Sequence, residues 1–305
     1  MRNLVIVALV GLGAQLVDGS VGMGYGVTSA TLLLASGVGP AAASAAIHLS
    51  EIGTSLVSGV AHHRLGNTDW RTVSILALPG FLGAFGGATL LASLDGDVAR
   101  PAVAVVLLVL GAWVTFRFLA LGTQRLSFGP HPSPFFLAPL GLVAGGLDAL
   151  GGGGWGPVGT TTLLSSGRLE PRKVVGSVDT AEFVVALGGS LGFLLSLGVP
   201  GVDWAAVGAL MLGGVVAAPI AAYVVRLLPA RILGVVAGGV IVLTNATTIA
   251  EVAGASDLTR AMIAALIFTL WVLWVSWAVR IEESVRTGVP IREARSARVR
   301  GLMVE

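Results

Sequence analysis

The chain has 305 residues, of which 55% are hydrophobic and only 11% are charged, and its formal net charge is +2. Its mean hydropathy is +0.91, which leaves too little polar surface for a soluble globule of this length. The composition therefore predicts a polytopic membrane protein without a large soluble domain. The absence of cysteine excludes disulfides, thiol nucleophiles and thiolate metal sites.

Long apolar segments follow one another along the chain, and about 20 helical residues suffice to cross the bilayer hydrocarbon. We predict an all-α membrane fold with full spans at about residues 40–63, 72–94, 98–117, 171–197, 203–226, 231–250 and 261–281, about seven in all. Two further segments, at about 3–36 and 134–167, are apolar but carry glycine runs in the middle. Because glycine weakens helices, we expect each of them to form a broken, re-entrant hairpin.

The two halves of the chain resemble each other. The stretch DGSVGMGYG, beginning at Asp18, aligns with DALGGGGWG, beginning at Asp148, so that a carboxylate, glycines and an aromatic residue fall in register. Farther along, Glu51 matches Glu182. Such a repeat predicts two equivalent units. We divide the chain into a first repeat at 1–125, a second repeat at 134–250, an extra helix at 259–281 and a basic tail at 282–305.

Basic residues predict the orientation of the spans, because Lys and Arg are enriched in cytoplasmic loops. The tail after Arg280 is rich in arginine, so we place the C-terminus in the cytoplasm. We then assign the loops alternately to the two sides of the membrane, starting from the C-terminus. The other basic loops fall in the cytoplasm only if segment 134–167 enters and leaves the membrane on the same side. The repeats are then inverted, each a hairpin plus three spans, as in secondary transporters of the inner membrane.

The broken hairpins are the predicted substrate site. A half-helix N-terminus near the membrane midplane offers free N–H groups and partial positive charge to an anion, and glycine lets a ligand approach the backbone. Tight helix packing is the alternative role for such glycines. The candidate substrate-binding residues, with both aromatic rings closing over the ligand, are Gly22, Gly24, Tyr25, Gly26, Thr28, Gly152, Gly154, Trp155, Gly156 and Thr160.

Ionisable side chains inside predicted spans form a second feature. His48 and Glu51 belong to a polar series that recurs every three or four residues, which places them on one helix face. Their repeat equivalents are Asp179 and Glu182. Such residues usually face a cavity and a partner. Because histidine titrates near neutral pH and a buried glutamate can do so, His48 and Glu51 could carry a coupling proton, or the pairs could lock the repeats together as a structural hydrogen-bonded pair.

Asp18 and Asp148 have two open interpretations as well: each could contact a ligand or ion, or cap the half-helix that follows it. Acidic side chains near an anion are unfavourable unless they are protonated or bound to a cation. That favours coupling to H⁺ or Na⁺. The alternative is a cation transporter (Na⁺, H⁺ or metal) that uses the paired acids directly. The candidate coupling or gating residues are Asp18, His48, Glu51, Asp148, Asp179 and Glu182.

The stretch GLGAQLVDGSVGMGYGVTSATLLLASGVGPAAASAAIHLSEIGTSLVSG, followed by GNTDW and by GGGGWGPVGTTTLL in the second half, resembles the TauE/SafE sulfite-exporter family of membrane permeases. The resemblance extends to about residue 281. It implies transport of small sulfur-containing anions such as sulfite or organosulfonates, usually outward across the bacterial inner membrane. Tyr25 and Trp155 stand where the family tends to have glycine, and His48 and Asp179 where it tends to have small hydroxyl residues, so we expect a reshaped binding site.

The interpretation is a secondary transporter and not an enzyme. No metal motif, no nucleophile with a base and no Walker A motif is visible in the sequence, which makes a membrane-embedded enzyme the least favoured alternative. We expect no cofactor, no resident metal and no nucleic-acid partner. The expected partners are the lipid bilayer, a small anionic substrate and an H⁺ or Na⁺ coupling ion, and a homo-oligomer is left open.

Overall fold

The computed structural model describes residues 4–21, 24–120, 130–166, 168–224 and 230–287. All regular structure within these ranges is helical, as the composition predicts. The first half contains α1 (Leu4–Val21), α2 (Tyr25–Ala35), α3 (Pro40–Arg64), α4 (Trp70–Ser93) and α5 (Gly96–Leu119). The second half contains α6 (Pro134–Gly151), the π-helix η1 (Trp155–Thr160), α7 (Thr161–Ser166), α8 (Pro171–Leu197), the 3₁₀ turn η2 (Val199–Gly201), α9 (Trp204–Val224) and α10 (Ala230–Val252), and α11 (Asp257–Thr287) follows.

Among the described helices, six are long and apolar enough to cross a membrane: α4, α5, α6, α8, α10 and α11. Helix α3 has 25 residues but does not qualify, because its histidine, glutamate and serine side chains lower its hydropathy. Helix α9 has 21 residues, of which Trp204–Ala218 form an apolar stretch whose side chains are all described. Conversely, α6 qualifies although the sequence predicts it as one arm of a hairpin. The count of about seven spans therefore stays a prediction.

Both predicted hairpins are interrupted at glycines. Helix α2 begins directly after Gly24, whose φ is 131°. Helix α6 is followed by Gly152, whose φ is 68°, before the chain continues as η1. Positive φ is costly for residues with a Cβ and open to glycine, so these glycines permit the breaks. The second arms pack against the first, α2 on α1 and η1 on α6. Gly22 lies outside the described residues.

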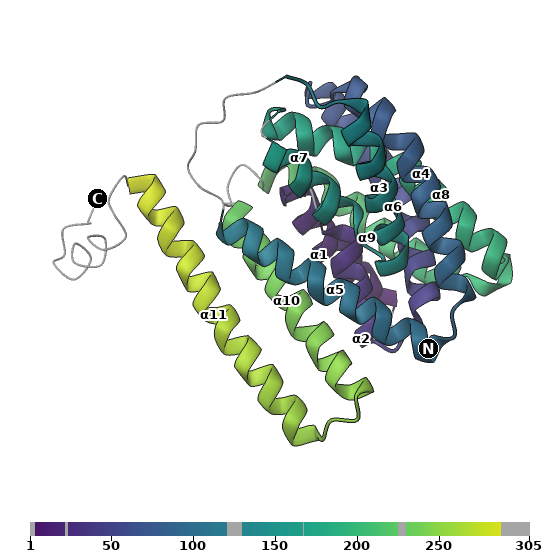
Figure 1. Ribbon diagram of the computed structural model, residues 1–305, viewed down its shortest axis with the longest axis vertical. Helices are drawn as coiled ribbons and strands as arrows, with labels where there is room; N and C mark the ends of the chain where they lie inside the picture. The colour runs from purple at the N-terminus through teal and green to yellow at the C-terminus, as the bar shows by residue number, and fades with distance from the viewer. Residues whose placement is uncertain (1–3, 22–23, 121–129, 167, 225–229, 288–305) are drawn as a thin grey trace.

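The two halves interlock through matching pairs of helices (Figure 1). Helix α1 packs along α9 of the other half, and its equivalent α6 packs along α4. Helices α3 and α8 pack against each other, as do α5 and α10. The repeat makes α1 equivalent to α6, α3 to α8, α4 to α9 and α5 to α10. When each helix is replaced by its equivalent, the same pairs of helices are obtained. The repeat seen in the sequence is therefore also a repeat of packing.

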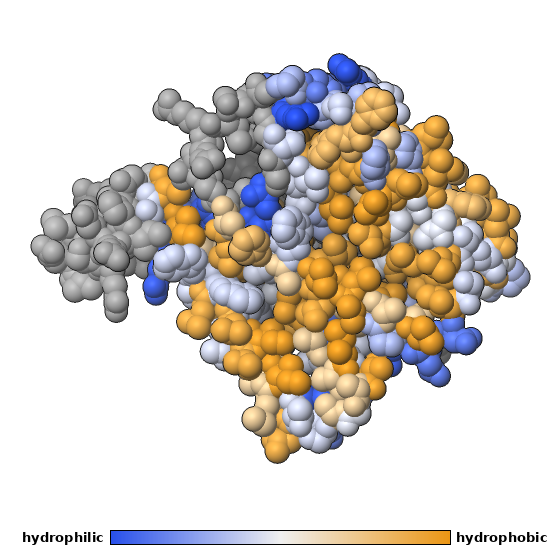
Figure 2. All heavy atoms as spheres, in the orientation of Figure 1, coloured by the Kyte–Doolittle hydropathy of each residue, from blue (hydrophilic) through white to orange (hydrophobic). Residues whose placement is uncertain are grey.

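Helix α11 lies beside α10 at the edge of the molecule (Figure 1). Only 6% of its apolar stretch is buried. Figure 2 shows hydrophobic residues covering much of the visible face, with hydrophilic residues mostly near its margins. A surface this apolar is unusual for a soluble protein and suits one surrounded by lipid. The remainder of the predicted basic tail, after Thr287, lies outside the described residues.

The Asp-Trp pair that occurs in both halves opens a helix in each. Asp69 Oδ1 accepts a hydrogen bond from the Thr72 N–H at 2.8 Å, and Asp203 Oδ1 accepts one from the Ala206 N–H at 3.0 Å. Both aspartates thus satisfy an otherwise unpaired donor of the first helical turn. Asp69 also contacts His131 Nε2 at 3.1 Å. Partial burial alone would raise the pKa of Asp69, but the bonds from Thr72 and His131 outweigh it and lower the pKa.

Replacing Asp69 with alanine is expected to lower the free energy of unfolding by about 0.5–2 kcal/mol at neutral pH, the usual cost of losing such a cap. Because the folded-state pKa is lowered, this contribution is complete above the unfolded-state pKa of about 3.9. It disappears as the pH falls through the folded-state value. Thermal unfolding of Asp69→Ala and wild type between pH 7 and 3 checks this. A difference that stays constant over that range contradicts it, and His131→Asn isolates the imidazole contribution.

Candidate functional site

Six of the predicted site residues form two clusters near the hairpin breaks, in which five residues are buried and Glu182 is partly buried. We call His48, Glu51 and Asp148 the histidine cluster, and Asp18, Asp179 and Glu182 the carboxylate cluster. Within each cluster, one ligand atom from each residue lies within 4.8 Å of the others. The clusters also act on each other electrostatically, since Glu182 is in range of both Glu51 and Asp148. The structure thus brings together all six residues predicted for coupling or gating.

Each cluster combines side chains from both halves of the chain. In the histidine cluster, α3 supplies His48 and Glu51, and α6 of the second half supplies Asp148. In the carboxylate cluster, α8 supplies Asp179 and Glu182, and α1 of the first half supplies Asp18. The clusters are therefore repeat equivalents. They differ at one position, where His48 in one corresponds to Asp179 in the other.

The aspartates hold the hairpin breaks together. Asp148 Oδ1 accepts hydrogen bonds from the N–H groups of Gly154 at 2.7 Å and Trp155 at 3.0 Å. Asp18 Oδ1 accepts one from the Tyr25 N–H at 3.3 Å. These are the first amides of η1 and α2, which lack a partner inside the helix. Asp18 and Asp148 therefore cap the half-helices that follow them, which is one of the two interpretations left open by the sequence. The capping uses one oxygen of each aspartate.

The two hairpin breaks touch each other, backbone against backbone. A Cβ added to Gly26 would lie 2.3 Å from the Gly152 carbonyl oxygen. A Cβ added to Gly153 would lie 1.9 Å from the Val27 nitrogen. Real Cβ atoms do not come this close, so only glycine fits at these points. In the described conformation, close packing thus accounts for glycine at positions 26 and 153.

Tyr25 and Trp155 anchor the hairpins to neighbouring helices. The hydroxyl of Tyr25 lies 3.0 Å from Ser50 Oγ and donates to the Leu210 carbonyl at 3.3 Å. The indole N–H of Trp155 donates to the Val178 carbonyl at 2.9 Å. Both side chains are almost fully buried, at 2% and 1% exposure. In this conformation the rings pack inside the protein.

The remaining predicted ligand contacts are also enclosed. Thr160 is fully buried, and Gly156 is buried within η1. The hydroxyl of Thr28 is buried and makes no hydrogen bond within the described part of the chain. An unsatisfied buried hydroxyl is costly. Among the predicted contact residues, Thr28 therefore offers a polar group that a ligand could satisfy.

Three side chains support the site without having been assigned a role from the sequence. Trp113 of α5 donates its indole N–H to Thr161 Oγ1 at 3.0 Å, and Asn245 of α10 donates its amide to Thr31 Oγ1 at 3.0 Å. Each bond ties the hairpin of one half to the last helix of the other half, α7 to α5 and α2 to α10. The sequence repeat could have pointed to these two bonds, because the acceptors Thr31 and Thr161 occupy equivalent positions in the two halves. His62 Nε2 lies 3.5 Å from Asp179 Oδ2, a contact that helix periodicity could not reveal.

This arrangement defines a class of protein. Apolar helices form two interlocked halves. Ionisable groups gather inside the protein where the hairpin breaks of the two halves touch. Both features are typical of membrane transporters with internal repeats. The sequence profile of the sulfite exporter TauE/SafE family matches residues 7–248. The chain belongs to this family.

A curated relative extends the comparison. The chain is 46% identical over 299 residues to a Bacillus subtilis (strain 168) protein named "Probable membrane transporter protein YtnM". The match covers 95% of this chain and 98% of that protein. No solved structure was found to match. The predicted family is confirmed, and the chain is a multi-pass membrane transporter.

Proposed function

We propose that this protein is a secondary permease of small sulfur-containing anions such as sulfite or organosulfonates, and that an ion gradient drives it. The family description supports the substrate class. One observation supports the site: at both hairpin breaks, the first amides of a half-helix bind the carboxylate oxygen of an aspartate. Those amides are already arranged to hold an oxyanion.

In the proposed mechanism, the substrate takes the place of the aspartate oxygen. When the two breaks separate, the amides of Gly154 and Trp155 leave Asp148 Oδ1 and donate to an oxygen of the anion instead. Gly24 and Tyr25 act in the same way beside Asp18 in the other half. Thr28 supplies a further hydroxyl. Tyr25 and Trp155 then close over the bound anion, as their position directly after the glycines allows.

The proposed architecture is a pair of inverted repeats in the inner membrane, each a re-entrant hairpin with three spans, followed by α11 and a cytoplasmic C-terminus. The exchange symmetry of the helix pairs supports two equivalent units. Antiparallel insertion of equivalent units produces two alternative openings of one site. Cysteine labelling from each side of the membrane tests this arrangement, since the chain has no cysteine of its own. Inaccessibility of position 2 from outside contradicts it.

We assign the coupling ion, H⁺ or Na⁺, to the carboxylate cluster, and gating to the histidine cluster. Three carboxyl groups in one buried site cannot all stay ionised without a compensating cation or proton. His62 supplies one possible compensating charge beside Asp179. An ion that binds there offsets the negative potential close to the anion site. Substrate and coupling ion then favour each other's binding.

The test is uptake by proteoliposomes. Wild-type protein is expected to accumulate labelled sulfite or an organosulfonate under an imposed Na⁺ or pH gradient, and carboxylates are expected to compete weakly. Accumulation of Na⁺ or a divalent cation with no effect of any sulfur anion would overturn the proposal. It would favour the cation transporter, which the two buried acidic clusters would otherwise support.

Glu182→Gln is expected to separate substrate binding from coupling. The variant keeps the shape of the side chain and removes one negative charge, so anion binding by thermal shift should stay within about threefold of wild type, a change below 1 kcal/mol. Accumulation driven by the ion gradient should be lost. Glu251→Gln is the matched control, because Glu251 is an exposed acid that pairs with Arg100 and Arg260 at the surface. Gradient-driven uptake by Glu182→Gln at the wild-type rate contradicts the assignment.

A further inference from the structure

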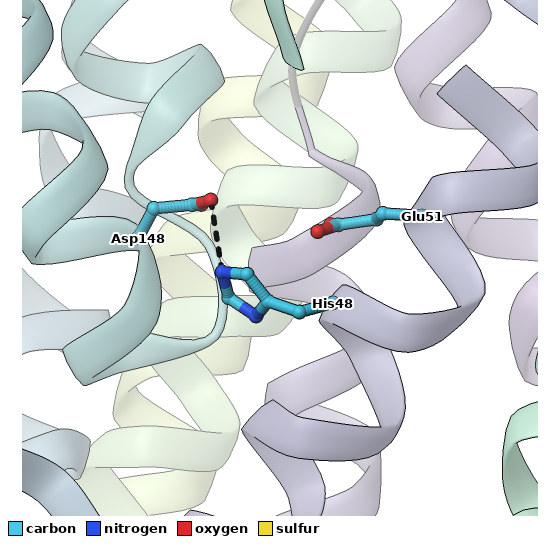
Figure 3. Close-up of side chains that lie close together, drawn as sticks. All are labelled: His48, Glu51 and Asp148. Atoms are coloured by element: carbon cyan, nitrogen blue, oxygen red, sulfur yellow. Dashed lines mark ion pairs between the residues drawn. The ribbon is translucent and has the colours of Figure 1, made fainter. Parts of the chain in front are cut away.

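The histidine cluster contains three polar atoms that point into one buried space and have no hydrogen-bond partner among the described residues: His48 Nε2, Glu51 Oε2 and Asp148 Oδ2. Figure 3 shows the three side chains converging from α3 and from the end of α6. The exposure of His48 is 0%, and that of Glu51 and Asp148 is 2% each. Buried polar atoms are normally paired. His48 Nε2 and Asp148 Oδ2 form an ion pair only when the imidazole is protonated, whereas one bound cation would pair with all three atoms.

The His48 and Asp148 side chains are held in place by contacts outside the cluster, as the ligands of a metal usually are. His48 Nδ1 lies 3.0 Å from the Ser44 carbonyl oxygen. That oxygen can only accept, so Nδ1 carries the hydrogen and Nε2 faces the cluster. Asp148 Oδ1 is fixed by two backbone amides, which leaves Oδ2 free. The His48 ring is held by an edge contact with Phe193 and has room only because residue 189 is glycine.

The distances fit two ligands of one small cation better than a hydrogen bond. His48 Nε2 and Asp148 Oδ2 are 3.3 Å apart without the alignment of a hydrogen bond. Bonds of about 2.0–2.1 Å from zinc to nitrogen and about 2.0–2.2 Å to oxygen place two tetrahedral ligands about 3.3–3.5 Å apart. One carboxylate oxygen of Glu51 lies within 4.8 Å of a ligand atom of each of the other two residues, close enough to complete the set by a side-chain adjustment.

The geometry points to a binding site for a divalent transition-metal ion of the Zn²⁺ class, held by His48 Nε2, Glu51 Oε2 and Asp148 Oδ2. One imidazole with two carboxylates selects such an ion over Na⁺ or Ca²⁺, which prefer oxygen ligands alone. Two carboxylates also balance the charge of one divalent cation, which removes the cost of burying them unpaired. The fourth tetrahedral position stays open for water or an anion.

This site departs from the expectation of no resident metal, and it does not depend on the nature of the transported anion. Because Glu51 and His48 come from the first half and Asp148 from the second, a bound ion would cross-link the two halves beside the hairpin breaks. The carboxylate cluster is the internal comparison. It has Asp179 where the histidine cluster has His48, so its oxygen-only ligands favour a hard cation instead.

The test uses the full chain in detergent, expressed with added Zn²⁺, with Co²⁺ as a spectroscopic probe. We expect about one Zn²⁺ per chain by elemental analysis and the strong visible absorption of tetrahedral Co²⁺. His48→Asn and Glu51→Gln should each lower Zn²⁺ affinity by at least about 100-fold, more than the loss typical of an outer ligand. The double variant His63→Asn/His131→Asn removes more exposed imidazoles and should keep the full metal content.

Two results would overturn the site. One is wild-type protein that holds no Zn²⁺ or Co²⁺ above background, which leaves a protonated His48 as the cation of the cluster. The other is metal content that survives in both His48→Asn and Glu51→Gln, which places the ion outside the histidine cluster. The wild-type Co²⁺ spectrum keeps the inference testable if either variant fails to fold. Anion uptake is measured separately, so the two proposals can fail independently.

Discussion

Gly26→Ala is expected to abolish anion uptake and to lower the thermal stability of the protein. Its new methyl group would lie 2.3 Å from the Gly152 carbonyl oxygen and 2.6 Å from the Gly153 Cα. Both are backbone atoms and cannot rotate away as a side chain would. The two hairpin breaks must therefore separate. Overpacking that forces the backbone to shift costs about 1–3 kcal/mol and occasionally more.

The expected loss of uptake follows from what the separation disturbs. Moving the breaks apart shifts Tyr25 and Trp155, whose amides bind the aspartate oxygens in both halves. The proposed cycle needs the breaks to close again after they have opened for the anion, and the added methyl group holds them apart throughout. Uptake by proteoliposomes should fall to the level of empty vesicles, and the unfolding temperature should drop in the same preparation.

Gly13→Ala is the matched control, because a Cβ at this helical position meets nothing within 4 Å. It should retain uptake and stability close to wild type. Gly153→Ala should behave like Gly26→Ala, since it enters the same contact from the opposite side. If Gly26→Ala transports normally, the two breaks are not packed against each other in the working protein, and the proposed opening of the site is wrong.

Much of the fold could be predicted from local sequence signals. Hydrophobic length predicted the helices, and the glycine runs predicted the breaks before α2 and after α6. The Asp-Trp pair of each half is a further local signal, since Asp69 and Asp203 cap the helices that begin there. These features depend on residues a few positions apart. The sequence therefore carries them directly.

The limits of prediction appear at contacts between distant segments. The sequence placed Gly26 and Gly152 in equivalent hairpins, but it could not show that they touch each other. It grouped His48 with Glu51 by helix spacing, yet Asp148 completes their cluster from the other half. Helix α3 shows a further limit, because the polar residues that build the site also lower its hydropathy below that of a typical span.

Asp148→Ala is the second change with a large expected effect, and it should be clearly more damaging than Asp18→Ala. Removing the Asp148 carboxylate leaves the amides of Gly154 and Trp155 without a partner and takes the ionic contact from His48. Each unsatisfied buried donor costs about 1–3 kcal/mol. Among the described residues, the equivalent change at Asp18 frees a single amide, whose bond is longer at 3.3 Å. Thermal unfolding of both variants in one detergent measures the difference.

Asp148→Asn separates the two roles of this residue. The asparagine carbonyl can still accept the hydrogen bonds from Gly154 and Trp155, so we expect stability to return most of the way to wild type. The negative charge facing His48 is gone, so gating, and with it ion-driven uptake, should remain impaired. Equal stability of Asp148→Ala and Asp18→Ala would contradict the capping argument. Full uptake by Asp148→Asn would show that transport requires only the hydrogen bonds of the cap and not the negative charge of Asp148.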